Sequence, residues 1–275
     1  VVTHFRLSPD AQHVVYRADL GVATQFELFA VPVAGGPTTR VNAPLFADGD
    51  VQTDFVVGPD SLSVFFRANA TLRTALDLFR GSILGRQPVT RINSAHGNGQ
   101  TVEEFRLTPN GRTLVYRADS TANERFELYR AASDGSDDPR VLNGPLVAFG
   151  DVSSFELSPD GKRVAYLADQ RVRFLTELFS VSVAGGAALR LSHDFASGGD
   201  VVSQRFSPDG SQVLFTLRAG AGLPTALYRA AADGLVPAAR LDTDGFNTLS
   251  VDAGFLVTRD GLWVVYVKLG GSPAR

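Results

Sequence analysis

Phe155-Glu-Leu-Ser-Pro-Asp-Gly161, followed by Val164-Ala-Tyr-Leu167, is the clearest copy of the stretch that decides the fold. The related stretches are Phe5-Arg-Leu-Ser-Pro-Asp10, Phe55-Val-Val-Gly-Pro-Asp60, Phe105-Arg-Leu-Thr-Pro-Asn110, Arg205-Phe-Ser-Pro-Asp209 and Phe255-Leu-Val-Thr-Arg-Asp260. Their last residues fall at positions 10, 60, 110, 160, 209 and 260, so the chain repeats about every 50 residues. Such a period is typical of repeated structural units that bury their faces against their neighbours.

Each copy predicts a strand that runs into a tight turn. Proline presets φ for the second position of a type I turn, and the Ser or Thr and Asp side chains can bond backbone N–H groups. Glycine at the fourth position tolerates a positive φ, a role that fits Gly161, Gly210 and Gly261. Ala11 and Ser61 take that place in the first two repeats.

Three further strands are predicted in each repeat. The second strands are nearly continuous apolar runs, which indicates strands covered on both faces: Val14–Arg17, Val64–Arg67, Leu114–Arg117, Val164–Leu167, Val213–Thr216 and Val264–Val267. The third strands are Phe26–Phe29, Leu76–Phe79, Phe126–Tyr129, Thr176–Phe179 and Thr225–Tyr228. A glycine turn then leads to short fourth strands that begin at Arg40, Arg91, Arg140, Arg190 and Arg240.

Four antiparallel strands per repeat favour an all-β fold, a β-propeller with blades that start near residues 1, 51, 101, 151, 201 and 251. The sixth repeat has only its first and second strands. We therefore predict six blades with the last incomplete, and the alternative is five blades plus an extra hairpin. The missing strands are expected upstream of Val1, downstream of Arg275 or from another molecule. We expect a single domain over 1–275, cut from a longer precursor because the chain begins at Val1 without Met.

Composition excludes several classes of function. The net charge of −3 comes without a basic stripe, so we expect no nucleic-acid partner. The chain has no cysteine, which excludes disulfides and thiolate metal sites. Its longest apolar run, Leu262–Val267, is too short to span a membrane.

Taken together, the Ser-Pro-Asp-Gly turn, the Val-Ala-Tyr strand, the Glu-Leu-Phe strand and the Gly-Gly then Arg-Leu step resemble the TolB-type propeller repeat over the whole chain. That repeat occurs in periplasmic scaffold proteins, in gating domains of serine oligopeptidases and in secreted proteins. The resemblance therefore implies a fold and a periplasmic or extracellular location more than one activity. The chain departs from the pattern where Leu, Val or Phe206 replaces the usual tryptophan, and where Arg259 replaces proline.

Charged residues recur at fixed places in the repeats. Arg17 with Glu27, Arg67 with Asp77 and Arg117 with Glu127 are ten residues apart on the second and third strands, so we expect cross-strand ion pairs with a structural role. Acidic and glycine residues also gather in Asp48-Gly-Asp50, Gly150-Asp151, Asp194 with Asp200, and Asp242-Thr-Asp244. None matches a calcium-binding loop, and both residue types are common turn formers. We expect solvated turns and no metal site.

No catalytic or cofactor-binding residues are predicted. His4, His13, His96 and His193 never share a metal-ligand spacing, although the fold could gather His4, His96 and His193. A Gly-x-Ser-x-Gly nucleophile elbow and a phosphate-binding glycine loop are absent. We therefore expect neither an enzyme nor a cofactor.

Variation between repeats points to recognition instead. The loops between second and third strands differ most: Leu20–Gln25, Thr71–Thr74, Ser120–Arg125, Gln170–Phe174 and Gly220–Pro224. Variable loops on a fixed frame are where binding usually resides. The first expectation is a scaffold domain that binds a protein or peptide partner on this loop face. The alternatives are an accessory gating propeller of a larger serine hydrolase, and an extracellular structural protein that self-associates through its incomplete blade.

Overall fold

The computed structural model describes residues 1–21, 24–95, 97, 99–122, 124–194, 199–243 and 249–270. Every regular element in these residues is a β-strand, so the prediction of an all-β chain is confirmed. The chain divides into two compact units, Val1–Val141 and Leu142–Arg275, and the single domain over 1–275 stays a prediction. In the described residues no helix has the length and apolar character needed to cross a membrane.

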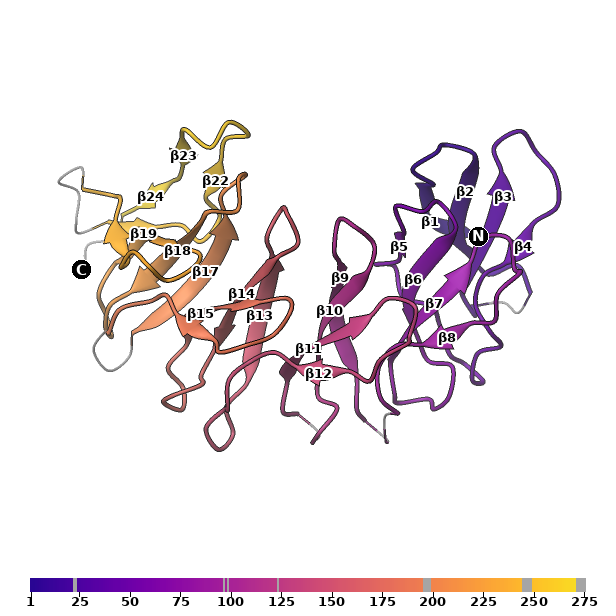
Figure 1. The fold of residues 1–275 in the computed structure, drawn as a ribbon, viewed down its shortest axis with the longest axis horizontal. Coiled ribbons are helices and arrows are strands. Elements are labelled where there is room, and N and C mark those ends of the chain that lie inside the picture. Colours follow the sequence, from indigo (N-terminus) through magenta and orange to yellow (C-terminus); the bar gives the residue numbers. More distant parts are fainter. Residues whose placement is uncertain are drawn as a thin grey trace. The chain divides into compact units, whose positions relative to one another are not determined.

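The first compact unit contains three four-stranded antiparallel sheets, in each of which neighbouring strands follow chain order (Figure 1). The strands are β1 Val2–Leu7, β2 His13–Ala18, β3 Glu27–Pro32 and β4 Thr39–Arg40; β5 Val56–Val57, β6 Ser63–Ala68, β7 Asp77–Ser82 and β8 Thr90–Arg91; and β9 Val102–Leu107, β10 Thr113–Ala118, β11 Glu127–Ala132 and β12 Arg140–Val141. Each sheet is one repeat of the sequence.

Two more four-stranded sheets and a partial repeat make up the second compact unit (Figure 1). The strands are β13 Val152–Leu157, β14 Arg163–Ala168, β15 Glu177–Ser182 and β16 Leu189–Arg190; then β17 Asp200–Phe206, β18 Gln212–Arg218, β19 Thr225–Ala231 and β20 Ala239–Arg240. In the sixth repeat, β21 Ser250–Val251 pairs with β24 Lys268–Leu269, and β22 Leu256–Val257 pairs with β23 Val264–Val265. The described residues of this repeat supply only first-strand and second-strand segments, as predicted.

An aromatic pair at one position sets the register of the two central strands. Tyr16 lies directly opposite Phe29, and their ring centroids are 5.8 Å apart. The same place is taken by Phe66 with Phe79, Tyr116 with Tyr129, Tyr166 with Phe179, and Phe215 with Tyr228. Stacked pairs of this kind add about 0.5–1.5 kcal/mol beyond the burial of their area. The repeated pair therefore fixes β2 on β3 and its counterparts in each later repeat.

Neighbouring sheets within a compact unit pack face to face. In the first unit, Val15 and Leu28 of the first repeat share one buried cluster with Phe66 of the second. In the second unit, Leu178 of the fourth repeat shares a cluster with Phe215 of the fifth. Burying a side chain of this size contributes about 1.5–3 kcal/mol. In the second to fifth repeats the apolar runs of the second strands are thus covered on both faces, as predicted. For the sixth repeat the prediction is wrong, because Val265 and Val267 are exposed where no further repeat packs on them in the described residues.

The turn between the first and second strands has the predicted conformation. In the first repeat the N–H of Ala11 donates to the carbonyl of Ser8 at 2.8 Å, and Ser8 Oγ accepts from the N–H of His13 at 2.9 Å. The fourth residue has a positive φ in all six turns: Ala11 at 55°, Ser61 at 58°, Gly111 at 72°, Gly161 at 70°, Gly210 at 72° and Gly261 at 72°. The role predicted for the glycines is confirmed, and Ala11 and Ser61 adopt the same conformation without being glycine.

Candidate functional site

Two loops of the fourth repeat, residues 143–151 before β13 and residues 169–176 between β14 and β15, lie against each other; we call them the fourth-repeat loops. The N–H of Asp169 donates to the carbonyl of Asp151 at 3.2 Å, and the N–H of Val147 donates to the carbonyl of Gln170 at 3.2 Å. A joining segment and a variable loop therefore form one surface.

A single aspartate fixes the base of this surface. Asp169 follows the last residue of β14, and its Oδ1 accepts a hydrogen bond from the N–H of Asp151. Its Oδ2 accepts from the N–H of Phe174 at 3.3 Å. In the third repeat Asp119 does the same, because its two carboxylate oxygens accept from the N–H groups of Thr101 and Glu124. The loop bases are thus held alike while the residues beyond them differ.

Acidic residues of the joining loops also accept hydrogen bonds from backbone N–H groups. Asp50 Oδ1 accepts from the N–H of Phe26 at 2.6 Å, and Asp200 Oδ1 accepts from the N–H of Thr176 at 3.0 Å. Both carboxylates tie the start of one repeat to the third strand of the repeat before it. Gly150 precedes Asp151 at a point where an added Cβ would lie 2.5 Å from the carbonyl oxygen of Asp169, so only glycine fits there. These aspartate and glycine residues therefore have structural roles in the loops.

The described residues contain no group of three or more His, Asp or Glu side chains placed to hold a metal ion. His4 is exposed on β1, and His13 lies on β2. His193 packs edge-to-face on Tyr228, with ring centroids 5.1 Å apart. His96 and Asp244, which the sequence also singled out, lie outside the described residues.

The predicted ion pairs between second and third strands are wrong. Arg17 lies opposite Leu28, and Glu27 lies opposite Ala18, so the two charged residues occupy opposite faces of the sheet. The register is the same for Arg67 and Asp77 and for Arg117 and Glu127. An offset of one residue moves a side chain to the other face, because side chains alternate along a strand. A spacing of ten residues could not reveal this offset.

The third-strand acids have other partners, which the sequence analysis missed. Asn42 Oδ1 accepts from the N–H of Leu28 at 2.7 Å, and Asn42 Nδ2 donates to Glu27 at 3.2 Å. Asn93 makes the same two contacts, with Leu78 and with Asp77. The available signal was an asparagine two residues after the arginine of the fourth strand. In these repeats that arginine is the last residue of the strand, whereas the sequence predicted it as the first. In the first two repeats this pair, half-buried at Glu27 and buried at Asp77, joins the segment after the fourth strand to the third strand.

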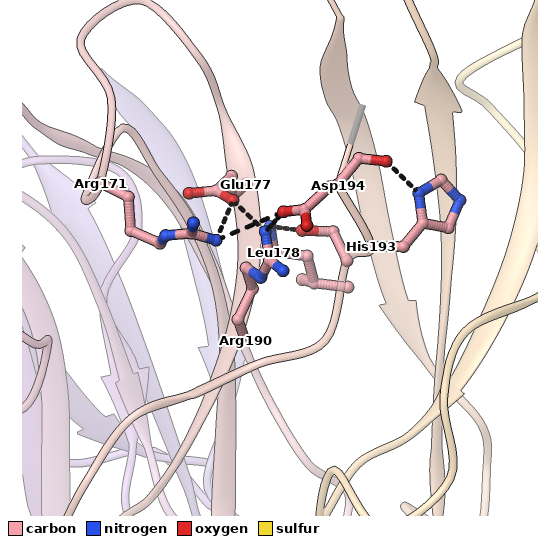
Figure 2. Close-up of polar contacts among 7 residues, drawn as sticks. Arg171, Glu177, Leu178, Arg190, His193 and Asp194 are labelled. Carbon is pink, nitrogen blue, oxygen red and sulfur yellow. Dashed lines mark hydrogen bonds and ion pairs between the residues drawn. The ribbon is translucent and has the colours of Figure 1, made fainter. Parts of the chain in front are cut away.

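In the fourth repeat Ser192 replaces that asparagine, and the acid pairs with two arginines (Figure 2). Glu177, whose side chain is 3% exposed, pairs with Arg171 at 3.2 Å and with Arg190 at 2.9 Å. Asp194 pairs with the same two arginines from the solvent side. Its hydrogen bond from Arg190 holds the pKa of the Asp194 carboxyl below the ordinary 3.8. Two guanidinium groups are therefore held between an inner and an outer carboxylate.

Beside this network the fourth-repeat loops expose two phenylalanines around one arginine. The Arg173 guanidinium lies over the ring of Phe149 at 4.6 Å and over the ring of Phe174 at 4.3 Å from the ring centroids. Phe149 is nevertheless 75% exposed and Phe174 76% exposed. A contact between a cation and an aromatic ring at an exposed site contributes only about 0.5–1 kcal/mol. We call Phe149, Arg173 and Phe174 the aromatic clamp.

Both clamp phenylalanines also have an unfavourable backbone conformation. Phe149 and Phe174 each have a φ of 61°, in the left-handed region that costs residues with a side chain about 1–2 kcal/mol. In other repeats the same places carry polar residues. Asp48 occupies the turn place of Phe149, while Thr24 and Glu124 occupy the loop place of Phe174, all with positive φ. The fourth repeat therefore combines two strained backbones with two exposed apolar side chains.

No protein-family model matches the chain, and no curated protein matches it in sequence. Among solved structures, it is similar to dipeptidyl peptidase 4 from Porphyromonas gingivalis with a TM-score of 0.70 and 12% identity, over 96% of this chain and 41% of that chain. It is similar to oligogalacturonate lyase from Vibrio parahaemolyticus with a TM-score of 0.56 and 11% identity, over 99% of this chain and 78% of that chain.

Solved TolB proteins are also among the structures similar to this chain. TolB from Acinetobacter baumannii has a TM-score of 0.43 and 20% identity, over 88% of this chain and 55% of that chain. The chain thus spans about half the length of that protein. Identities this low concern the fold alone. The four-stranded antiparallel sheets of the repeats, together with the similarity to the dipeptidyl peptidase and lyase structures, identify an all-β fold of the β-propeller class.

Proposed function

We propose that the chain is a non-catalytic binding domain that recognises a protein or peptide through its variable loops. One observation carries this proposal: the bases of corresponding loops are held by the same aspartate hydrogen bonds, while the residues beyond the bases differ in type. Asp119 and Asp169 make equivalent contacts in the third and fourth repeats. A fixed base with a variable tip is the arrangement that presents recognition residues without disturbing the frame.

The fourth-repeat loops are the strongest candidate for this binding. Gln170–Phe174 carries two arginines and an exposed phenylalanine, whereas Thr71–Thr74 in the second repeat carries two threonines and one arginine. Apolar and charged groups lie together at the fourth repeat, and aromatic and arginine side chains are the types most enriched in binding hot spots.

A peptide-display selection against the immobilised full chain tests the proposal. Selected clones should lose binding when one variable loop is replaced by the corresponding loop of another repeat, for example Gln170–Phe174 by Ser120–Glu124. Unfolding midpoints of the loop-swapped proteins serve as the control for folding. Clones whose binding survives replacement of all five loops would contradict the proposal, and so would a selection that enriches no clone.

We also propose a periplasmic or extracellular location, because the TolB-type repeat that the sequence resembles occurs in periplasmic and secreted proteins. Cell fractionation of the natural full-length protein tests this location. Recovery with cytoplasmic markers would contradict it.

A second candidate function is that of an accessory propeller that gates substrate access to a serine hydrolase. Similarity to 41% of a dipeptidyl peptidase 4 chain, at a TM-score of 0.70, favours this candidate. The uncut reading frame on both sides of the chain tests it. A neighbouring segment with a Gly-x-Ser-x-Gly elbow would support it, and flanks without a hydrolase module would remove it.

A third candidate is self-association through the incomplete sixth repeat. Its second-strand segment exposes Leu262, Trp263, Val265 and Val267. Among the described residues β23 pairs only with β22, so its other edge is free to accept a strand from a second copy.

A further inference from the structure

The aromatic clamp combines an unfavourable backbone conformation with exposed apolar side chains, and neither feature stabilises the fold. Phe149 and Phe174 come from two loops, 25 positions apart in the sequence, and both lie against one guanidinium. Each has a left-handed backbone that Asp, Asn or Gly would adopt more readily, and each exposes about three quarters of its surface. Strained residues of this kind persist where they serve a function.

The charge of Arg173 indicates what the clamp would accept. No salt bridge joins Arg173 to a carboxylate within the described parts of the chain, whereas Arg171 in the same loop pairs with Glu177 and Asp194. The guanidinium carbon lies 4.6 Å and 4.3 Å from the two ring centroids, and the rings carry no oxygen that could accept its N–H groups, so a carboxylate can accept two hydrogen bonds from them. The exposed ring surfaces are suited to an apolar side chain.

We propose that the aromatic clamp binds an acidic peptide segment, in which an Asp or Glu carboxylate pairs with Arg173 and a neighbouring apolar side chain packs on Phe149 or Phe174. The proposal rests on the proposed function of the variable loops and specifies the ligand chemistry of one of them. A polyanion such as nucleic acid is disfavoured, because Asp151 and Asp169 lie at the base of the same surface and the chain carries a net charge of −3.

Substitutions by asparagine separate the effect on binding from the effect on folding. Phe149→Asn and Phe174→Asn introduce a residue that tolerates a positive φ, and they remove an exposed ring without adding charge. We expect both variants to keep or raise the unfolding temperature of the protein. Arg173→Gln removes the charge, and Arg173→Lys keeps the charge but loses the planar group. Arg86→Gln, in the turn after β7, is a control substitution outside the fourth repeat.

The experiment uses a displayed heptapeptide library and the full chain. Clones selected on the unaltered protein should be enriched in Asp or Glu next to an apolar residue. A synthetic peptide of the most enriched sequence is then measured by isothermal titration calorimetry. Its affinity should fall about tenfold or more with Phe149→Asn, Phe174→Asn or Arg173→Gln, and should not change with Arg86→Gln. Affinity should also fall as salt concentration rises.

Several results would overturn the clamp proposal. One is enrichment of peptides without acidic residues, and another is unchanged affinity in all three clamp variants. A third is a large loss of stability in both asparagine variants, which would show that the rings hold the loops together. Clones that are insensitive to the clamp variants but lost on replacing another loop would overturn the clamp while leaving the proposed binding function standing. A selection without enrichment would overturn both.

Discussion

At the scale of single residues, side chains with a positive φ divide into two groups. Ala11 and Ser61 occupy a turn position that glycine fills in the four later repeats. Phe149 and Phe174 occupy loop positions where other repeats have polar residues. In the first group the turn only carries the conformational cost of a positive φ. In the second group the same cost comes together with an exposed apolar side chain. The two groups therefore respond differently to substitution.

Replacing Ala11 by glycine should stabilise the protein. Ala11 has a φ of 55°, and glycine adopts this conformation without the penalty of a Cβ. We expect a gain of about 0.5–1 kcal/mol in the free energy of unfolding, measured by urea denaturation.

The matched control is Gly210→Ala in the fifth repeat. Gly210 has a φ of 72°, and an added Cβ would meet Pro159 Cδ at 3.5 Å, an ordinary contact. The substitution should therefore cost about 1 kcal/mol through backbone conformation alone. Equal midpoints for Ala11→Gly and the unaltered protein would show that the first turn relaxes out of the left-handed region.

The turn aspartates should make the protein sensitive to acid. Hydrogen bonds from Ser207 and Ser211 lower the pKa of Asp209 to about 2 from its ordinary 3.8. The hydrogen bond from Ser8 lowers the pKa of Asp10, and that from Ser158 lowers the pKa of Asp160. Because the folded-state pKa is below the unfolded one, this stabilisation is present above pH 3.8 and is lost as the pH falls toward 2.

Asp209→Asn tests the contribution of one turn. Asn110 holds the same place in the third repeat, where its Oδ1 accepts from Thr108 Oγ1 at 2.8 Å, so asparagine fits the turn. In urea titrations the unaltered protein should be the more stable one at pH 6, and the difference should shrink toward pH 2. A difference that stays constant over this range would contradict the role of ionised Asp209.

The turns were predictable from sequence because their chemistry is local. Ser8, Asp10 and the residue at the fourth position are neighbours in the chain, so their hydrogen bonds follow from spacing. The aromatic clamp was not found, because Phe149 and Phe174 meet only through the pairing of two loops. Its signal was available in the alignment of repeats, where a polar residue becomes phenylalanine at both places.

At the scale of strands, a buried acid beside the fourth strand recurs although its position changes. Glu27 and Asp77 lie on the third strand and bond an asparagine. In the fifth repeat Ala226 takes the strand position and Asp242 takes the asparagine position. Asp242 Oδ1 then accepts from the N–H of Leu227, and its carboxylate pairs with Arg240 and Lys268. The hydrogen bond from the third-strand N–H is kept, while the carboxylate moves from the third strand to the segment that follows the fourth strand.

Ser192→Asn should stabilise the fourth repeat. Glu177 Oε2 is buried without a hydrogen-bond partner in the described structure, and the shorter Ser192 hydroxyl bonds only the N–H of Leu178 at 3.2 Å. An asparagine amide would donate to Glu177 as Asn42 does to Glu27, so the free energy of unfolding should rise by about 1 kcal/mol. Urea denaturation measures the change.

The reverse substitution, Asn42→Ser, is the control and should be destabilising, because the amide donor to Glu27 is lost. A fall in stability of Ser192→Asn would mean that Arg171 and Arg190 leave no space for the amide beside Glu177.

Strand positions and their antiparallel order were predictable from sequence, but side-chain contacts between the second and third strands were not. Apolar runs, glycine turns and the arginine in each fourth strand mark the elements because they are local signals. The predicted pairing of Arg17 with Glu27 is wrong because register decides the face, and register is set by the Tyr16 and Phe29 pair across the strands. A shift of one residue in register leaves the strand position unchanged but places Arg17 and Glu27 on opposite faces of the sheet.

At the scale of the molecule, the sheets of each compact unit pack on one another as a frame, and the loops between second and third strands differ in sequence from repeat to repeat. The second compact unit ends in a partial sixth repeat, in which Val251 and Phe255 are buried but Leu262, Trp263, Val265 and Val267 are exposed. Trp263, the one tryptophan of the chain, is 69% exposed there. Its fluorescence therefore reports directly on whether this repeat becomes covered.

If the sixth repeat self-associates, Trp263 emission should move to shorter wavelength as protein concentration rises, and light scattering should show a growing mass. The double variant Leu262→Ser, Trp263→Ser should keep a monomer mass at the same concentrations, because the exposed apolar surface is removed. Emission and mass that do not change with concentration would remove self-association from the candidate functions.

Hydrogen–deuterium exchange of the full chain, with and without the selected peptide, tests most directly whether the frame stays fixed while the loops bind. Added peptide should slow exchange in residues 146–151 and 169–176 and leave β14 and β15 unchanged, since their backbone groups are already paired. Protection confined to the turns around Ser158–Asp160 or Ser207–Asp209, or spread over the strands, would contradict this account.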